Sequence, residues 1–122
     1  MASTHITVVY KWTAKPGQLD ALSTIYAGVT EAMQQNEPGA TDVQVYRSEE
    51  ENVLYVRDEF VDADALAFHL TQTAAAHFGD LLAIATPGSF LFFGDVPAEL
   101  QAATKQMGLA SEFGTRLGGF TR

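Results

Sequence analysis

The sequence predicts an α+β fold, a ferredoxin-like subunit in which a split βαβ pattern builds an antiparallel sheet covered by helices. Stretches with apolar residues at every second position and stretches with apolar residues every three or four positions follow the order strand, helix, strand, strand, helix, strand. The 122 residues suit one compact domain, and 47% of them are hydrophobic, enough for a core. We expect a single domain over residues 1–122, with its core at about 5–95 and a C-terminal helix and arm at about 96–122.

The first strand is predicted over His5–Thr13, where one face carries apolar side chains. A helix follows over Pro16–Glu37, because proline suits the first helical turn and apolar residues then recur at steps of three and four. Strands over Thr41–Ser48 and Val53–Val61 alternate in the same way as the first. The polar run Glu49–Asn52 between them predicts a turn, so these two strands are expected to form a hairpin.

The second half is predicted to begin with a helix over Asp62–Ala85, because aspartate is a favourable N-cap residue. A bend in this helix is expected near Thr71 or Gly79. A fourth strand is predicted over Ser89–Asp95, after a Pro-Gly pair, and a third helix over Pro97–Gly108. The remaining tail contains three glycines and two phenylalanines, and we expect it to pack as an arm.

Two helices are expected to cover one face of the sheet and to leave the other face partly apolar. The uncovered face is predicted to carry Val9, Val43, Val45, Tyr55 and Phe93, mixed with Lys11, Arg47 and Arg57. Contiguous apolar surface of this extent marks an interaction site. The sequence therefore predicts a homodimer with the two sheets packed face to face.

Charge and composition exclude several functions. Seven Lys and Arg residues against 15 Asp and Glu residues give a net charge of −8, which disfavours nucleic acid and anionic membrane surfaces as partners. No apolar run approaches the roughly 20 residues of a membrane helix, and the first residues do not resemble a signal peptide. Without cysteine there is no disulfide and no thiolate metal site. We expect a cytoplasmic protein.

Several short motifs occur in an order that resembles a known family. They are Lys15-Pro16-Gly17, the turn Asn36-Glu37-Pro38-Gly39-Ala40, the strand end Asp58-Glu59-Phe60, and Phe68-His69-Leu70 followed by His77-Phe78. Over roughly residues 5–95 the chain resembles the antibiotic biosynthesis monooxygenase superfamily. The resemblance implies subunits that pair into a dimeric α+β barrel. It is more specific for the fold than for an activity.

The resemblance also implies a chemistry. Characterised members oxidise electron-rich aromatics, such as quinols and polyketide anthrones, with dioxygen and without metal or flavin. The protein must then supply a base, a dry pocket and orientation. The resemblance thus implies a small aromatic substrate and no cofactor.

His69 is the candidate base, since a histidine pKa of about 6.5 suits proton transfer near neutral pH. The alternative is a structural histidine that is hydrogen-bonded to a strand carbonyl. His77 is a further candidate for substrate contact, although a structural place on the helix surface is the simpler interpretation. On a continuous helix the two rings lie about 12 Å apart, too far for a shared ion, so no metal site is predicted.

Aromatic residues are candidates for the walls of the pocket. Trp12, Phe60 and Tyr26 are predicted to contact the substrate, against the alternative that they only fill the core. Glu59 is expected to point away from Phe60 and to pair with Arg57 or Lys11.

Three functions follow from these observations. The first is a cofactor-independent monooxygenase that acts on a quinol-like or polyketide-like aromatic, with His69 as base. The second is a haem-degrading relative, which is disfavoured because the first strand lacks the asparagine of that branch and His69 occupies the place of its helix tryptophan. The third is a non-enzymatic dimer that binds a small ligand.

Overall fold

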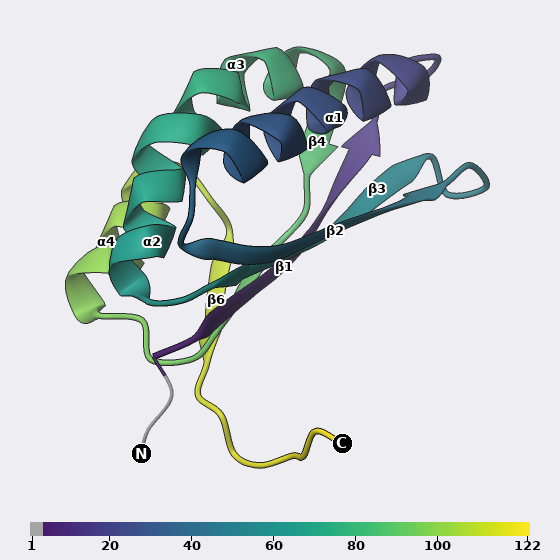
Figure 1. Cartoon of the computed structure of the whole chain (residues 1–122). Coiled ribbons are helices and arrows are strands. Elements are labelled where there is room, and N and C mark those ends of the chain that lie inside the picture. The colour runs from purple at the N-terminus through teal and green to yellow at the C-terminus, as the bar shows by residue number, and fades with distance from the viewer. Residues whose placement is uncertain (1–3) are drawn as a thin grey trace.

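The structure, a computed structural model, describes residues 4–122 as a helical layer on one face of a mixed sheet (Figure 1). In chain order the elements are β1 (Ile6–Ala14), α1 (Leu19–Asn36), β2 (Ala40–Ser48), β3 (Val53–Phe60), α2 (Ala63–Phe68), the π-helix η1 (His69–Ala74), α3 (Ala75–Ile84), β4 (Ala85–Pro87), β5 (Phe90–Phe93), α4 (Ala98–Gln106) and β6 (Ser111–Gly114). The strand order is β2-β3-β1-β5-β6, and β4 also pairs with β1. The predicted α+β, ferredoxin-like fold is confirmed. In the part of the chain described, no helix is long and apolar enough to cross a membrane.

The first helix starts later than its proline indicates. It begins at Leu19, because residues 15–18 form a tight turn in which the Gln18 N–H donates to the Lys15 carbonyl over 2.9 Å. Gly17 has a φ of 76°, so Pro16 and Gly17 hold the central positions typical of a type II turn. Pro16 therefore turns the chain between β1 and α1 instead of opening the helix.

The second helical segment begins as predicted but is not a continuous α-helix. Asp62 is its N-cap, and its Oδ1 accepts the Ala65 N–H over 2.9 Å. The region of the expected bend at Thr71 is the π-helix η1, whose wider turn separates α2 from α3. Such π segments occur frequently at functional sites.

The expected fourth strand corresponds to β5, and a short strand that was not expected, β4, precedes it where the predicted helix ends. Gly88 lies between them against β1, where its N–H donates to the Lys11 carbonyl over 2.9 Å. A Cβ at this position would lie 3.2 Å from Lys11 Cγ. The close approach of Gly88 to β1 therefore separates the two short strands.

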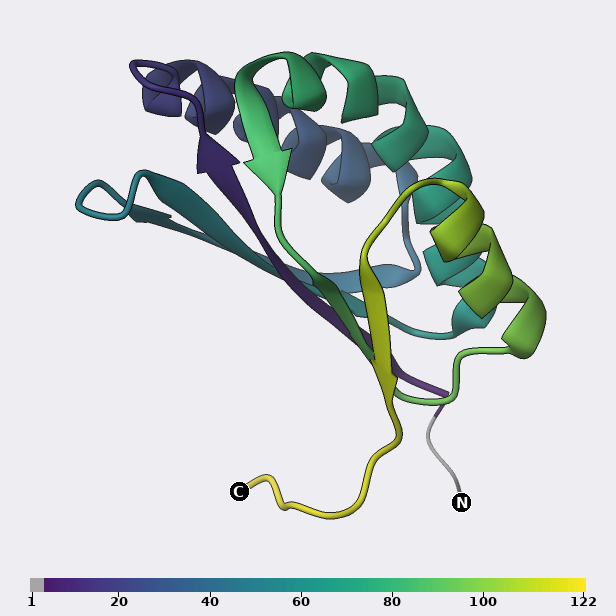
Figure 2. The same cartoon turned by 180° about the vertical axis from the view of Figure 1, so that it is seen from behind.

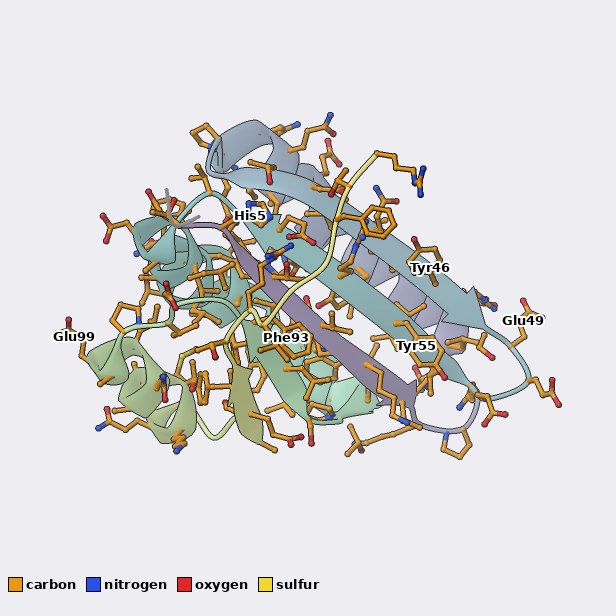
Figure 3. The ribbon with its side chains drawn as sticks, turned by 90° about the horizontal axis from the view of Figure 1, so that it is seen from below. His5, Tyr46, Glu49, Tyr55, Phe93 and Glu99 are labelled. Atoms are coloured by element: carbon orange, nitrogen blue, oxygen red, sulfur yellow. The ribbon has the colours of Figure 1, made fainter. Side chains whose placement is uncertain are left out.

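A register shift in β2 corrects the predicted composition of the outer sheet face. The shift between Ala40 and Asp42 places Val45 opposite the buried Val56. Val43, Val45 and Arg47 therefore lie on the helix side, and Arg47 donates to Asp20 and Ser23 of α1. Tyr46 takes their place on the outer face, which also carries Val9, Lys11, Tyr55, Arg57 and Phe93 (Figure 3).

The C-terminal extension returns to the sheet. The strand β6 pairs in parallel with β5 (Figure 2). Phe113 of β6 stacks on Phe92 of β5 with ring centroids 5.2 Å apart. The last residues, 115–122, leave the sheet edge and run beneath the outer face (Figures 1 and 3). In the single chain Leu117 and Phe120 on this segment are almost fully exposed.

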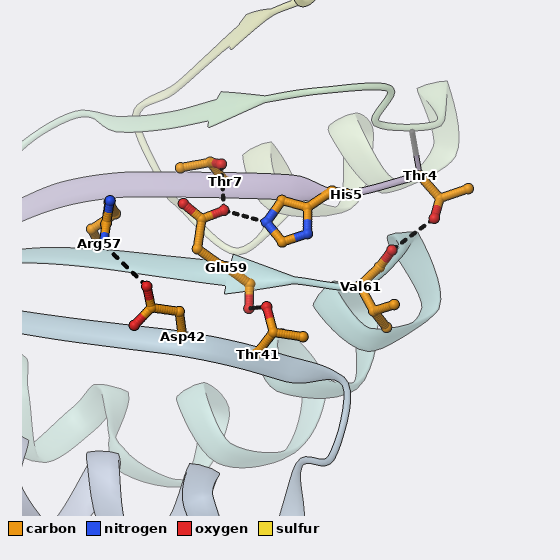
Figure 4. A network of polar contacts seen from close by, with 8 residues as sticks. All are labelled: Thr4, His5, Thr7, Thr41, Asp42, Arg57, Glu59 and Val61. Carbon is orange, nitrogen blue, oxygen red and sulfur yellow. Dashed lines mark hydrogen bonds and ion pairs between the residues drawn. The ribbon is translucent and has the colours of Figure 1, made fainter. Parts of the chain in front are cut away.

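Glu59 points away from Phe60 as expected, but its partners differ from the predicted ones. Its carboxylate binds the ring of His5 and accepts the Thr7 hydroxyl at 2.6 Å (Figure 4). Arg57 instead pairs with Asp42, at 3.1 Å between guanidinium and carboxylate. Glu59 and Arg57 therefore each pair with a neighbouring segment on opposite sides of β3 and not with each other.

Candidate active site

The helical layer and the inner face of the sheet enclose a small, mainly apolar cavity of about 40 Å³. All five residues proposed from the sequence line it: Trp12, Tyr26, Phe60, His69 and His77. The other lining residues are Val8, Tyr10, Val29, Asp58, Leu66, Leu70, Ala74, Phe78, Leu81, Phe90, Phe92, Met107 and Leu109. A volume of 40 Å³ holds only a few water molecules, so an aromatic ligand must widen the cavity.

His69 is the first residue of the π-helix and is only 6% exposed. Its Nδ1 lies 3.1 Å from Oε2 of Glu37, the buried residue that follows α1. A carboxylate accepts, so Nδ1 carries the hydrogen, and in the neutral ring Nε2 has a free lone pair. No described residue hydrogen-bonds Nε2. The partner is therefore a carboxylate and not the strand carbonyl considered above.

The electrostatics of this pair favour a charged glutamate. Burial raises the pKa of Glu37, but the hydrogen bond with His69, the Thr73 side chain and the charge interaction with His69 together outweigh it, and the net shift is downward. An ionised Glu37 fixes the tautomer of His69 and stabilises the imidazolium that forms when Nε2 takes a proton. This is the arrangement of a general base with an orienting carboxylate.

A second acid group lies in the same cavity. Asp58 is 1% exposed on the inner face of β3, and its Oδ2 accepts the Tyr10 hydroxyl at 2.9 Å. The Tyr10 oxygen is in turn 2.7 Å from the Tyr26 hydroxyl. Burial raises the pKa of Asp58 to about 6, although the nearby His69 ring and the Tyr10 hydrogen bond oppose the rise.

Aromatic rings form much of the remaining wall. Trp12 contacts Phe78 edge-on at 5.8 Å between centroids, and Phe60 lies 5.2 Å from the His69 ring. Trp12 Nε1 is buried and has no hydrogen-bond partner among the described residues. Trp12 is therefore both a packing residue and a donor without an acceptor.

His77 lies at the half-buried side of the cavity together with Ala74, Phe78 and Met107. Its Nδ1–H donates to the Thr73 carbonyl over 2.9 Å, one turn earlier in the helix. Across residues 4–122 no group of three or more His, Asp or Glu side chains is arranged to hold a metal ion. His77 is therefore one of the more accessible side chains of the cavity wall.

A family model described as antibiotic biosynthesis monooxygenase matches residues 5–81. The chain belongs to this family. Among curated proteins, none matches the sequence.

Solved structures share the fold. MupZ from Pseudomonas fluorescens superposes with a TM-score of 0.82 at 18% identity, over 98% of this chain and 96% of MupZ. SnoaB, a cofactor-independent oxygenase from Streptomyces nogalater, gives a TM-score of 0.64 at 20% identity, over 79% of this chain and 97% of SnoaB. The protein SO0527 from Shewanella oneidensis gives a TM-score of 0.62 at 22% identity, over 74% of this chain and 87% of SO0527.

The region matched by the monooxygenase family model contains every acid or base group of the cavity, from Tyr10 to His77. The extension formed by α4 and β6 lies outside it, yet it supplies Met107 and Leu109 to the cavity wall. The likeness to MupZ covers nearly the whole chain, so MupZ shares this extension.

Two carboxylates of the site, Glu37 and Asp58, were not predicted from the sequence. Both left a signal. Glu37 falls four positions after the buried Met33 and so continues the apolar face of the helix. Asp58 lies between Val56 and Phe60 on the inward face of a period-two strand. An acid on an apolar stripe indicates a buried, partnered group.

Proposed function

We propose that this family member is a cofactor-independent monooxygenase that oxidises an enolisable or phenolic aromatic, quinol-like or polyketide-like, with dioxygen. The observation that carries the proposal is the buried His69–Glu37 pair at an apolar cavity. We assign His69 as base, and Trp12, Phe60, Tyr26 and His77 as substrate contacts.

The reaction balances without a further oxidant. His69 Nε2 takes a proton from an acidic carbon of the substrate, and the resulting carbanion gives one electron to dioxygen. The substrate radical and superoxide combine to a peroxide after protonation. Loss of water from the peroxide leaves a carbonyl, so one oxygen atom stays on the product and the other leaves as water. The dry cavity protects the carbanion from protonation by solvent.

Oxygen uptake tests the proposal. Purified protein treated with a metal chelator is expected to raise the rate of oxygen consumption above the spontaneous rate with at least one member of a panel of quinols and anthrones. Mass spectrometry in ¹⁸O₂ is expected to show one labelled atom in the product. Uptake by none of the panel would favour the alternative, a dimer that binds a small ligand without turning it over.

We also propose that a single domain over residues 1–122 works as a cytoplasmic homodimer joined through the outer sheet faces. On this face Tyr46, Tyr55 and Phe93 are 57%, 42% and 44% exposed in the single chain. Together with Val9 and Leu91 they form an apolar surface on neighbouring strands, which a second copy would remove from water. The cysteine-free sequence agrees with a reducing compartment.

Light scattering after size-exclusion chromatography is expected to give the mass of a dimer at micromolar concentration. The double substitution Tyr55→Glu with Phe93→Glu is expected to give a monomer, because it places four carboxylates in the interface. Phe68→Glu is the matched control, since Phe68 is 48% exposed but lies on the helical layer. A monomeric wild type would refute the dimer.

A further inference from the structure

The row of hydrogen bonds from Asp58 through Tyr10 to Tyr26 has two possible directions. Each tyrosine has one hydroxyl hydrogen. When Asp58 is ionised, Tyr10 donates to its Oδ2 and Tyr26 donates to Tyr10, so both hydrogens are used. When Asp58 carries a proton, it donates to Tyr10, Tyr10 donates to Tyr26, and the Tyr26 hydrogen is free. Protonation of Asp58 on β3 thus makes a donor available at Tyr26 on α1.

The freed hydrogen lies beside a second donor. Trp12 Nε1–H is buried without an acceptor among the described residues, and Trp12 and Tyr26 line the same cavity. Burial and the Asp58 charge raise the pKa of Tyr26, while the nearby Trp12 side chain opposes the rise, as a donor close to the hydroxyl does. Two neutral donors in the wall of one apolar cavity suit one oxygen atom that gains negative charge.

We infer that Trp12 Nε1–H and the Tyr26 hydroxyl form an oxyanion site for a ketone with an acidic α-hydrogen, and that Asp58 frees the Tyr26 hydrogen for it. The inference rests on the proposed role of His69 as base. His69 Nε2 removes the α-proton, the C–H electron pair becomes a C=C bond, and the carbonyl π pair moves to the oxygen. The reverse steps return a proton to carbon. This exchange consumes no oxidant, so the site would enolise a ketone without dioxygen.

The charge of Asp58 depends on groups from each element packed around it. They are Tyr10 on β1, Tyr26 and the terminal Glu37 of α1, His69 at the start of η1, and Glu59 on the same strand. Glu37 and Glu59 favour the protonated form of Asp58, and a positive His69 ring disfavours it. Proton transfer to His69 is therefore coupled to the state of Asp58, and both must be followed across pH.

Anaerobic hydrogen exchange tests the inference. The ketone 2-tetralone is incubated with the protein under nitrogen in D₂O, and loss of the α-proton signal is followed by NMR. Wild type is expected to exceed the spontaneous rate, and Tyr26→Phe and Trp12→Phe are each expected to lose about 10²-fold, the usual effect of removing one oxyanion donor. Tyr46→Phe, an exposed tyrosine on the outer face, is the matched control.

Asp58→Asn supplies a readout that a structural role would not change. The amide N–H donates to Tyr10 at every pH, so the ratio of variant to wild-type rate is expected to rise roughly tenfold or more from pH 5 to pH 7.5. A constant ratio would overturn the role of Asp58. Absence of exchange in wild type, or full exchange in folded Tyr26→Phe and Trp12→Phe, would overturn the oxyanion site. Proton exchange without oxygen uptake would support the oxyanion site and refute the monooxygenase. Oxygen uptake that is unchanged in both Tyr26→Phe and Trp12→Phe would support the monooxygenase and refute the oxyanion site.

Discussion

His69→Ala is expected to abolish oxygen consumption above the spontaneous rate while the folded dimer survives. A positioned general base contributes about 10²–10⁴-fold to a rate, and His69 is the cavity histidine whose Nδ1 is held by a buried carboxylate, whereas the Nδ1 of His77 is held by a backbone carbonyl. Removal of the ring also leaves the buried Glu37 carboxylate without its partner, so some loss of thermal stability is expected. Oxygen uptake and the melting temperature, measured on the same preparation, separate the two effects.

Two comparison variants sharpen this result. Glu37→Gln keeps an acceptor for the His69 Nδ1–H but removes the negative charge, so a smaller loss of turnover is expected than for His69→Ala. His77 lies in the half-buried part of the cavity wall, and its Nδ1–H is already bound to the Thr73 carbonyl. The His77→Ala variant is therefore expected to raise KM more than it lowers kcat. An unchanged rate in folded His69→Ala would remove His69 from the mechanism.

Asp58→Asn is expected to stabilise the protein near neutral pH. Burial raises the pKa of Asp58 from 3.8 to about 6, so the folded state binds this proton more tightly than the unfolded chain. The stabilisation from protonation is present below pH 4 and is lost as the pH rises through about 6. A shift of about two units corresponds to a loss on the order of 3 kcal/mol, which the neutral asparagine avoids.

The measurement is the difference in unfolding free energy between Asp58→Asn and wild type, from urea titrations at pH 4, 5, 6 and 7.5. The difference is expected to grow in favour of the variant up to pH 7.5. Taking the difference between the two proteins cancels the contribution of the other titrating groups to the pH dependence of stability. One of them is Glu37, whose lowered pKa makes the folded state more stable as the pH rises. Asp42→Asn, at an exposed carboxylate on the outer face, is expected to show no such trend. A flat difference would mean that Asp58 ionises freely in the folded state.

Periodicity was sufficient to predict most of the fold. The alternation in β1 and the helical spacing in α1 place Tyr10, Trp12 and Tyr26 on inward faces, as the structure has them. The register shift at the start of β2 was not predictable, because two strand phases fit the same residues and only pairing with β3 selects one. The place of Pro16 was ambiguous in the same way, since a helix start and a turn both accept proline.

The walls and the histidines of the cavity were predictable, but the pairing of its buried carboxylates was not. A histidine among apolar residues stands out, whereas the Glu37 and Asp58 carboxylates belong to segments with independent reasons for polarity, a helix end and a strand end. Their partners come from distant parts of the chain: His69 lies 32 positions from Glu37, and Tyr10 lies 48 positions from Asp58. Such pairs depend on tertiary packing, which no local pattern encodes.

The π-helix sets the rotational phase between the two ends of the second helical segment. A π turn takes about one residue more than an α turn, so the residues after it are rotated by roughly 100° relative to a continuous α-helix. With η1 in place, His69 at its start and Phe78 and Leu81 beyond it all face the same cavity. In a regular helix of the same length, Phe78 and Leu81 would turn away from the sheet. The extra residue in this turn thus places His69, the proposed base, on the same side of the helical segment as the cavity wall formed by Phe78 and Leu81.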